Sequence, residues 1–278
     1  MFGTREEILT ALTRLMQTCP GNVVDLPTER RTVTIYETPL VGSAAADDPI
    51  FLKYKQPEVI GPEWMSPEEW LPGAGSVVSF FFPFTEEIRS SERAVLTDET
   101  SEAWLYGRIE GQAFMEDLMQ HLADTLTDAG LRVCVPMLDP RFGTIRNVVP
   151  RGTSEDLKVI SAWSERHAAF ACGLGTFGMS KGIITEKGMA GRFASLITDA
   201  EIPPKGRPYT DIYEYCIRCG ACSRRCPVNA IPPGEIKNNL LCSGRIDDSR
   251  RRYAPRYGCG KCQTCVPCEF RNPSRARS

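Results

Sequence analysis

Nine of the twelve cysteines of this chain lie after residue 215, in a pattern that constrains the fold more than any other feature. The first run, CIRCGACSRRCP, begins at Cys216, and the second, CGKCQTCVPC, begins at Cys259. A cubane iron–sulfur cluster needs four thiolates around a compact core, and CxxCxxC spacing lets one looping segment supply three of them. Bare CxxC pairs also form tetrahedral zinc sites, but CxxCxxCxxxCP is far more specific. We therefore expect two [4Fe-4S] clusters, with zinc or a [3Fe-4S] cluster as the alternatives.

The spacing also suggests which cysteines share a cluster. The fourth cysteine of such a run, Cys226, cannot fold back onto the cluster of the first three and typically serves the neighbouring one. Since the region offers nine cysteines for eight positions, one is spare, and the fourth ligand of the first cluster is either Cys268, which we prefer, or Cys265. The expected ligands are Cys216, Cys219, Cys222 and Cys268 for the first cluster, and Cys226, Cys242, Cys259 and Cys262 for the second.

The remainder of the chain is much larger than two clusters require. Its 278 residues are 42% hydrophobic, which suits a sizeable core, and a formal net charge of -2 implies no polyanionic partner. The longest apolar run, SVVSFFFPF, is too short to span a bilayer, and the first residues show no signal-peptide core. We therefore expect a cytoplasmic protein without a membrane partner, in which clustered cysteines indicate a metal site and not a disulfide framework.

Hydrophobic periodicity predicts strands alternating with helices, which is typical of an α/β or α+β core. The continuous apolar run at 76–84 predicts a central strand. Prolines and glycines at 203–208 mark a link, so we expect a cofactor-binding domain at 1–205 and a ferredoxin-like domain at 206–278. The expected helices lie at 5–18, at 97–129 and from 161 to either Gly173 or Gly175, and the expected strands at 31–39, 76–84, 131–138, 182–185 and 193–199.

A glycine-rich stretch, GLGTFG, lies at Gly173–Gly178 between these two parts. It is not a dinucleotide-binding fingerprint, because that motif follows a strand and opens a helix, whereas this stretch follows an expected helix. We interpret it as a loop whose backbone approaches another group closely.

The segment from Trp163 to Asp199 resembles the epoxyqueuosine reductases and, more distantly, the reductive dehalogenases. The resemblance rests on an ERxxAxxxGLGxxG pattern, then FxxLxTD, then the two cysteine runs, with CysSer at 242–243 between them. The matching residues are Glu165, Arg166, Ala169, Gly173, Leu174, Gly175, Gly178, Lys181, Ile184, Phe193, Leu196, Thr198 and Asp199.

This resemblance implies a cobalamin held in a nitroreductase-like α/β domain, with the two clusters passing electrons to it one at a time. The corrin would lie between that domain and the ferredoxin-like module. The sequence departs from the family where an Asp-Ser-Ala-Pro stretch is expected, because Val159 or Ile160 replaces the acid that is the proposed proton donor. The implied cofactor-binding residues are Arg166, Gly173, Leu174, Gly175, Thr176, Phe177 and Gly178.

Reduction at a metal-bound cofactor needs a proton source within hydrogen-bond reach of the substrate. Tyr106 aligns roughly with a family tyrosine near the active site, and Arg108 follows it closely in the sequence. Glu165 is the third candidate. Each has a plainer interpretation: Tyr106 as a core residue of a long helix, and Glu165 with Arg166 as an ion pair on a helix surface.

Positive charge accumulates in the cysteine region, where it could dock an acidic electron donor such as a ferredoxin or flavodoxin. The function we favour is a cobalamin-dependent reductase of a small organic substrate, with no nucleic-acid partner expected. One alternative is an iron–sulfur electron-transfer or activator protein for another corrinoid protein, and another is a flavin-binding relative. The basic residues are Arg224, Arg225, Arg245, Arg250, Arg251, Arg252 and Arg256.

Overall fold

A four-stranded antiparallel sheet lies at the centre of the computed structural model, which describes residues 2–277. Every residue of β4 is buried, and β4 pairs on both sides, which confirms the prediction of a central strand at 76–84. The strand order is β3 (Leu40–Ala45), β4 (Ser76–Pro83), β10 (Gly191–Thr198) and β5 (Val133–Cys134).

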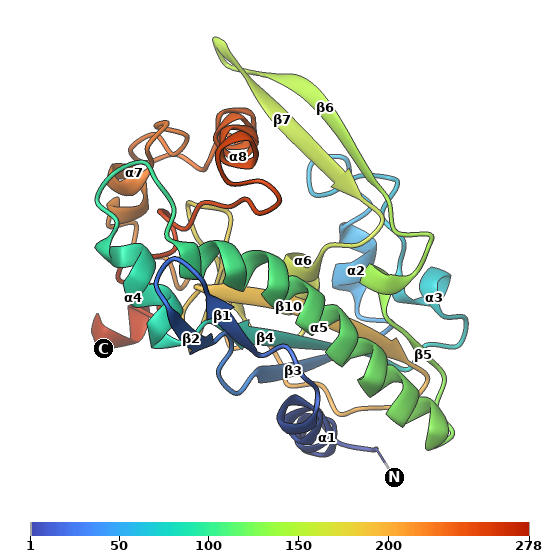
Figure 1. Cartoon of the computed structure of the whole chain (residues 1–278). Coiled ribbons are helices and arrows are strands. Elements are labelled where there is room, and N and C mark those ends of the chain that lie inside the picture. The colour runs from blue at the N-terminus through green and yellow to red at the C-terminus, as the bar shows by residue number, and fades with distance from the viewer. Residues whose placement is uncertain (1, 278) are drawn as a thin grey trace.

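Alternate residues of β4 face two different layers of helices, as the two-residue period of a strand requires. Val78, Phe80 and Phe82 face a core that contains residues of α1 (Arg5–Thr18) and α5 (Glu102–Asp128). Val77 faces the opposite core with α2 (Pro49–Lys53), α3 (Pro67–Trp70) and α6 (Glu165–Ala171). Figure 1 shows α5 crossing one face of the sheet. The chain is thus a mixed α+β protein with a cysteine-rich C-terminal region, as predicted.

The ends of the elements follow local chemistry that the sequence only partly revealed. Helix α1 begins at the predicted residue because Thr4 and Glu7 form a capping box. Helix α5 begins later than predicted, since the Ser101 hydroxyl accepts a hydrogen bond from Trp104 N at 3.3 Å. The strand expected at 131–138 is confined to β5, because Pro136 starts the 3-10 helix η1 (Pro136–Leu138).

The β6–β7 hairpin and the helix α8 beside it were not predicted. The hairpin of β6 (Thr144–Arg151) and β7 (Ser154–Ser161) projects from the body beside α8 (Asn239–Tyr253), as Figure 1 shows. The Asp156 carboxylate accepts a hydrogen bond from Asn239 N at 2.5 Å, which ties the hairpin to the start of α8. The other elements are β1 (Val23–Leu26), β2 (Arg31–Thr34), α4 (Glu86–Ala94), β8 (Gly175–Phe177), β9 (Ile183–Thr185), α7 (Ala221–Arg225) and η2 (Ser274–Arg277).

The cysteine region packs directly against the sheet-containing body. Phe177 N donates to Ile212 O at 2.8 Å, Tyr215 N donates to the Thr176 hydroxyl at 2.8 Å, and Met189 N donates to Cys268 O at 2.9 Å. The boundary expected near residue 205 falls in the segment 201–207, which forms neither helix nor strand. In the part of the chain described, no helix has the length and apolar character needed to cross a membrane.

Candidate functional site

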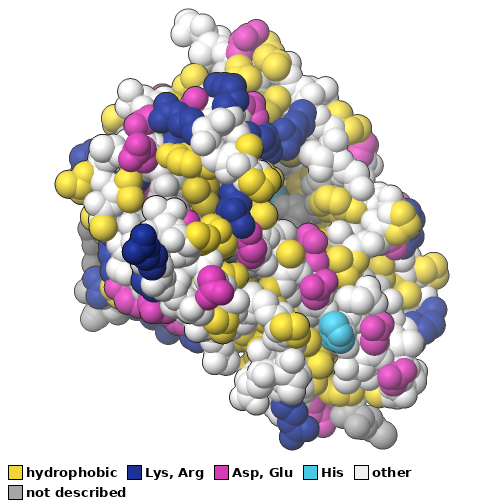
Figure 2. All heavy atoms as spheres, viewed as in Figure 1, with side chains coloured by type: hydrophobic (Ala, Val, Ile, Leu, Met, Phe, Trp, Pro, Cys, Tyr) yellow, Lys and Arg dark blue, Asp and Glu magenta, His cyan; other side chains and the backbone are white. Residues whose placement is uncertain are grey.

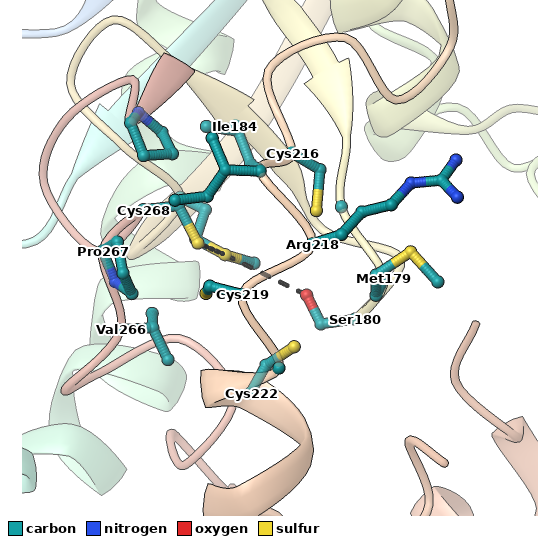
Figure 3. A pocket seen from close by; sticks show the side chains of 15 residues that line it. Met179, Ser180, Ile184, Cys216, Arg218, Cys219, Cys222, Val266, Pro267 and Cys268 are labelled. Atoms are coloured by element: carbon teal, nitrogen blue, oxygen red, sulfur yellow. Dashed lines mark hydrogen bonds between the residues drawn. The ribbon is translucent and has the colours of Figure 1, made fainter. Parts of the chain in front are cut away.

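Four cysteines from two distant segments line a small hollow, which we call the outer cysteine group. Cys216, Cys219 and Cys222 come from the loop before α7 and its first turn, and Cys268 comes from the last cysteine run. Burial and the charges of Cys216 and Cys219 raise the pKa of the Cys222 thiol, which is consistent with their proximity. Figure 3 shows the four side chains around this space.

The outer group depends on backbone that turns sharply between its cysteines. Gly220, which precedes α7, has φ +72°, a left-handed conformation that glycine adopts without steric cost. Apolar side chains of Ile184, Met189 and Val266 complete the wall, and the Cys268 and Met189 sulfurs lie 3.4 Å apart. The hollow is therefore an apolar pocket edged by thiols, and Cys219 is its exposed member.

A second set, the inner cysteine group, consists of Cys226, Cys242, Cys259 and Cys262. Burial raises the pKa of the Cys262 thiol to about 11; the charge of Lys237 opposes this effect, and the nearby charges of Cys242, Cys222 and Cys226 add to it. Because Cys222 belongs to the outer group, the two groups adjoin. Within residues 2–277, no three Cys, His, Asp or Glu side chains form a group that would hold a single metal ion.

The ninth cysteine of the region, Cys265, differs from the other eight in its surroundings and backbone conformation. It is exposed, has φ +56°, and its backbone N–H donates to the Glu269 carboxylate at 2.7 Å. The backbone of Cys265 therefore forms a turn, and its side chain is exposed, whereas Cys268 is half-buried.

The inner group is held against the N-terminal half of α5 by the loop that carries Cys259. A Cβ added to Gly260 would lie 2.6 Å from the Trp104 ring, and one added to Gly258 would lie 2.8 Å from Cδ of Arg108. Gly258 O also accepts a hydrogen bond from the Thr100 hydroxyl at 3.1 Å. Only glycine allows this loop to lie so close to the helix.

Arg166, a predicted cofactor-binding residue, lies near the inner group. Its side chain is exposed, yet desolvation by the surrounding protein lowers the pKa of its guanidinium, and the charges of Cys242 and Cys262 act on it. Figure 2 shows a recess in this face of the molecule between α8, the β6–β7 hairpin and α5, with basic side chains along its rim.

Glu165, a predicted catalytic residue, is the first residue of α6 and carries an unusual carboxyl group. Burial raises its pKa to about 8, although a hydrogen bond from Ser195 opposes this effect. The Ser195 hydroxyl donates to Oε2 at 2.6 Å, and Trp163 Nε1 donates to the same hydroxyl at 2.8 Å. The other oxygen, Oε1, is buried without a partner. Glu165 is therefore mainly protonated at neutral pH.

Tyr106 and Arg108, the other predicted catalytic residues, project from α5 toward the loop that precedes Cys259. The Arg256 guanidinium lies 3.6 Å from the centre of the Tyr106 ring. The Arg108 guanidinium lies 4.4 Å from the centre of the Tyr257 ring, and burial lowers its pKa to about 10. The structure thus brings Arg108 to the inner cysteine group, while Tyr106 packs under a cation.

The glycine-rich stretch makes a close approach, as expected, but to the chain's own backbone. A Cβ added to Gly173 would lie 2.1 Å from Gly206 O, and one added to Gly175 would lie 1.9 Å from Ile184 O. Leu174, Thr176 and Phe177 are buried, and Gly178 lines the hollow of the outer group. These contacts give a second physical reason for the glycines besides lining a cofactor. The glycines let this stretch pack closely where the cysteine region is seated on the body.

Two residues at the inner group were missed by the sequence analysis. Arg192 on β10 donates from Nε to the Gln112 side-chain oxygen at 3.1 Å and so faces α5. Tyr257 lies between Arg108 and Arg250, whose guanidinium is 4.1 Å from the centre of its ring. Neither belongs to a recognisable motif, since their proximity arises from the packing of β10, α5 and the cysteine loop.

The comparisons with known proteins agree with the cysteine chemistry and with the fold. The family model described as "4Fe-4S binding domain" matches residues 209–231. No curated protein matches the sequence at a significant level.

Two kinds of solved structure are similar to this chain. An epoxyqueuosine reductase bound to an epoxyqueuosine-modified tRNA stem loop aligns with a TM-score of 0.50 and 18% identity, over 94% of this chain and 66% of that one. A reductive dehalogenase, described in terms of B12-dependent dehalogenation, aligns with a TM-score of 0.50 and 17% identity, over 86% of this chain and 31% of that one. The chain therefore carries a 4Fe-4S binding domain and shares the fold of epoxyqueuosine reductases and reductive dehalogenases, while spanning less than two thirds of the length of the first and a third of the second.

Proposed function

We propose that this chain is an iron–sulfur reductase that passes electrons through two [4Fe-4S] clusters to a cobalamin, which reduces a small organic substrate. The outer cysteine group would hold the first cluster and the inner group the second. The observation that carries the proposal is the position of exposed Arg166 beside Cys242 and Cys262 of the inner group, because a cluster there would lie next to an accessible residue that a cofactor could reach. The nitroreductase-like character of the body is part of the same proposal.

Two buried polar atoms of the predicted catalytic residues have no partner in the protein. Arg108 Nε and Glu165 Oε1 are buried without a hydrogen-bond partner, which is costly unless a ligand satisfies them. Arg166 would contact the cobalamin, and the cobalamin would supply the low-potential cobalt that the side chains of the protein lack.

Glu165 is the proton donor that the chain itself offers. Trp163 Nε1–H donates to the Ser195 oxygen, so the hydroxyl hydrogen of Ser195 is directed at Glu165 Oε2. The proton of the neutral carboxyl group is therefore held at Oε1, which has no partner in the protein. A carboxylic acid with a pKa near neutrality is well suited to general acid catalysis. In this proposal Glu165 replaces the acid that the family carries where Val159 or Ile160 stands here.

The surface around the outer group suits a small acidic electron donor. Of the seven basic residues expected to form a docking patch, Arg250, Arg251, Arg252 and Arg256 pair with carboxylates and Arg245 is buried. Arg224 is exposed next to the outer group, and its guanidinium donates to Cys219 O at 3.2 Å. Arg218 is also exposed and lines the hollow. The proposed docking site is therefore narrower than the sequence suggested and is centred on exposed Cys219.

The alternative function, an electron-transfer or activator protein without its own cobalamin, is favoured by one observation. Val159 is 44% exposed on β7 and Ile160 is buried, so this segment supplies no acid to the recess.

Titration of the anaerobically purified, cluster-reconstituted protein with hydroxocobalamin, followed by cobalt(II) electron paramagnetic resonance, tests the proposal. A stoichiometric base-off signal is the expected result. If the clusters are intact and cobalamin remains unbound, the reductase function is wrong. A parallel titration with flavin mononucleotide, followed by fluorescence quenching, then distinguishes a flavin protein from an electron-transfer protein.

A further inference from the structure

Three arginines from separate elements gather where the body meets the inner cysteine group. Arg108 lies on α5, Arg166 on α6 and Arg192 on β10. Arg192 Nε donates to the side-chain oxygen of Gln112, which lies one helical turn after Arg108 on α5, so Arg192 and Arg108 are neighbours. The positive charge of Arg192 also lowers the guanidinium pKa of Arg108 and of Arg166, in agreement with one cationic cluster of the three, the arginine triad.

The direct partners of the triad are electrically neutral. Arg192 Nε donates to the Gln112 side-chain oxygen at 3.1 Å, and Arg166 Nη1 donates to Lys181 O at 2.7 Å. Arg108 stacks on the Tyr257 ring, and its Nε has no partner. Among the described residues, no carboxylate forms an ion pair with any of the three guanidinium groups.

The acidic groups that flank the triad are already engaged. Glu110 forms an ion pair with Arg256, and the Glu165 carboxyl accepts a hydrogen bond from Ser195. Arg108 Nε is buried without a partner, and a positive charge held in this way without a counter-charge is costly, so its retention points to an anion that arrives from outside the chain.

The charge of the inner cluster is the simplest alternative counter-charge. It explains Arg166, because the Cys242 and Cys262 sulfurs act on that residue. It does not explain Arg108, because the charges of Arg192 and Arg250 lower the guanidinium pKa of Arg108 and only the phenol groups of Tyr257 and Tyr36 oppose them. An anion for Arg108 and Arg192 is therefore still missing.

We propose that the arginine triad binds an oxyanion of the substrate, so that the substrate is a small organic carboxylate or phosphate. The triad converges from α5, α6 and β10, offers guanidinium N–H donors with no carboxylate partner, and adjoins the inner cysteine group. Guanidinium groups match carboxylate and phosphate oxygens in geometry as well as in charge. The assignment of this anion to a substrate rests on the proposed reductase function, whereas the oxyanion site itself does not.

Isothermal titration calorimetry of the cluster-loaded, cobalamin-free protein tests the site, with benzoate and inorganic phosphate as separate probes at low chloride. We expect saturable binding of at least one probe. Its dissociation constant should rise at least about tenfold in Arg108→Gln and in Arg192→Gln, since each variant loses a charge-assisted hydrogen bond to the anion. Arg108→Lys should recover part of the affinity. The matched control is Arg14→Gln, which removes an exposed arginine of α1 and should change nothing.

Absence of saturable heat with both probes overturns the oxyanion site, and so does an equal loss of affinity in Arg14→Gln. Iron content and thermal midpoint of each variant show whether it is folded, and if Arg108→Gln is not, Arg192→Gln carries the test.

A second titration distinguishes the two possible sources of the anion, the substrate and the phosphodiester of cobalamin. The probes are cobalamin and cobinamide, which lacks the phosphodiester. Equal cobalamin affinity in wild type and Arg108→Gln supports a substrate site. Weaker cobalamin binding with unchanged cobinamide binding overturns the substrate assignment and assigns the triad to the cofactor. If neither corrinoid binds to wild type, the proposed reductase function fails, and the substrate assignment fails with it, but the benzoate and phosphate titrations still decide whether the oxyanion site exists.

Discussion

The outer and inner cysteine groups come from the same two sequence runs but have opposite surroundings. The outer group lines an apolar hollow, and its member Cys219 is exposed beside Arg218 and Arg224. The inner group is pressed against α5 and adjoins Arg166. An electron carrier from outside can approach only a cluster near the surface, and a cofactor in the recess adjoins only the inner one. The difference therefore gives the proposed pathway a direction, from the outer to the inner cluster.

The largest effect we expect is the separate loss of each cluster. In Cys262→Ser the iron content should fall from about eight to about four atoms per chain, because one of two cubanes loses a ligand. The outer cluster should remain reducible by dithionite, and reduction of added hydroxocobalamin should fall to the background rate.

Cys268→Ser should instead remove the outer cluster, and the matched control Cys265→Ser should retain all the iron. Iron and sulfide analysis with electron paramagnetic resonance measures each result. If Cys265→Ser halves the iron while Cys268→Ser does not, the membership of the outer group is wrong.

The second largest effect concerns how the outer group is seated on the body. In Gly175→Ala the new Cβ would lie 1.9 Å from Ile184 O, so β8 and β9 must separate. We expect a loss of about 3 kcal/mol in the free energy of unfolding, or a fall of roughly 6–10 °C in the thermal midpoint.

Gly143→Ala is the matched control, because no atom lies within 4 Å of its added Cβ. Differential scanning calorimetry compares the two variants. If Gly175→Ala leaves the thermal midpoint unchanged and abolishes only cobalamin binding, the glycine-rich stretch lines the cofactor and does not serve as a seat.

The contrast between these two regions also shows what the sequence could predict. The cysteine runs, the central strand at 76–84 and the helix at 5–18 were predictable because each depends on local spacing or periodicity. The meeting of Arg108, Arg166 and Arg192 was not, since it depends on how α5, α6 and β10 pack. The glycine-rich stretch lies between these cases. Its close backbone contact follows from glycine, but the identity of the contacting group depends on tertiary structure.

A smaller effect concerns the buried acid near the inner group. The pKa of Glu165 is raised from 4.5 to about 8, so between these values the folded protein binds more protons than the unfolded chain. Stability should therefore fall as pH rises from about 5 to 8 and then level off, by an amount on the order of a few kcal/mol. Glu165→Gln removes this dependence, so its thermal midpoint should exceed that of wild type at pH 8.5 but not at pH 5.

Glu58→Gln, at an exposed position on the surface, is the control for that measurement. If the difference in thermal midpoint between wild type and Glu165→Gln is the same at every pH in this range, the pKa of Glu165 is not raised, and the residue is not the proposed proton donor.

The smallest effect we expect concerns the outer surface, where solvent and salt weaken each charge. Arg224→Gln and Arg218→Gln should each lower the second-order rate of reduction by an acidic ferredoxin or flavodoxin by about threefold at low ionic strength, because electrostatic steering accelerates association. The difference from wild type should vanish in high salt. Stopped-flow mixing with reduced donor measures the rates.

Arg251→Gln is the informative control for the docking site, because Arg251 is exposed on α8 but pairs with Asp248. A larger loss of rate in Arg251→Gln than in Arg224→Gln would move the docking site to α8, beside the inner group. The direction inferred from the two cysteine groups would then reverse, since the donor would approach the cluster that adjoins the recess. The three substitutions thus test whether exposure of Cys219 or total positive charge determines where electrons enter the protein.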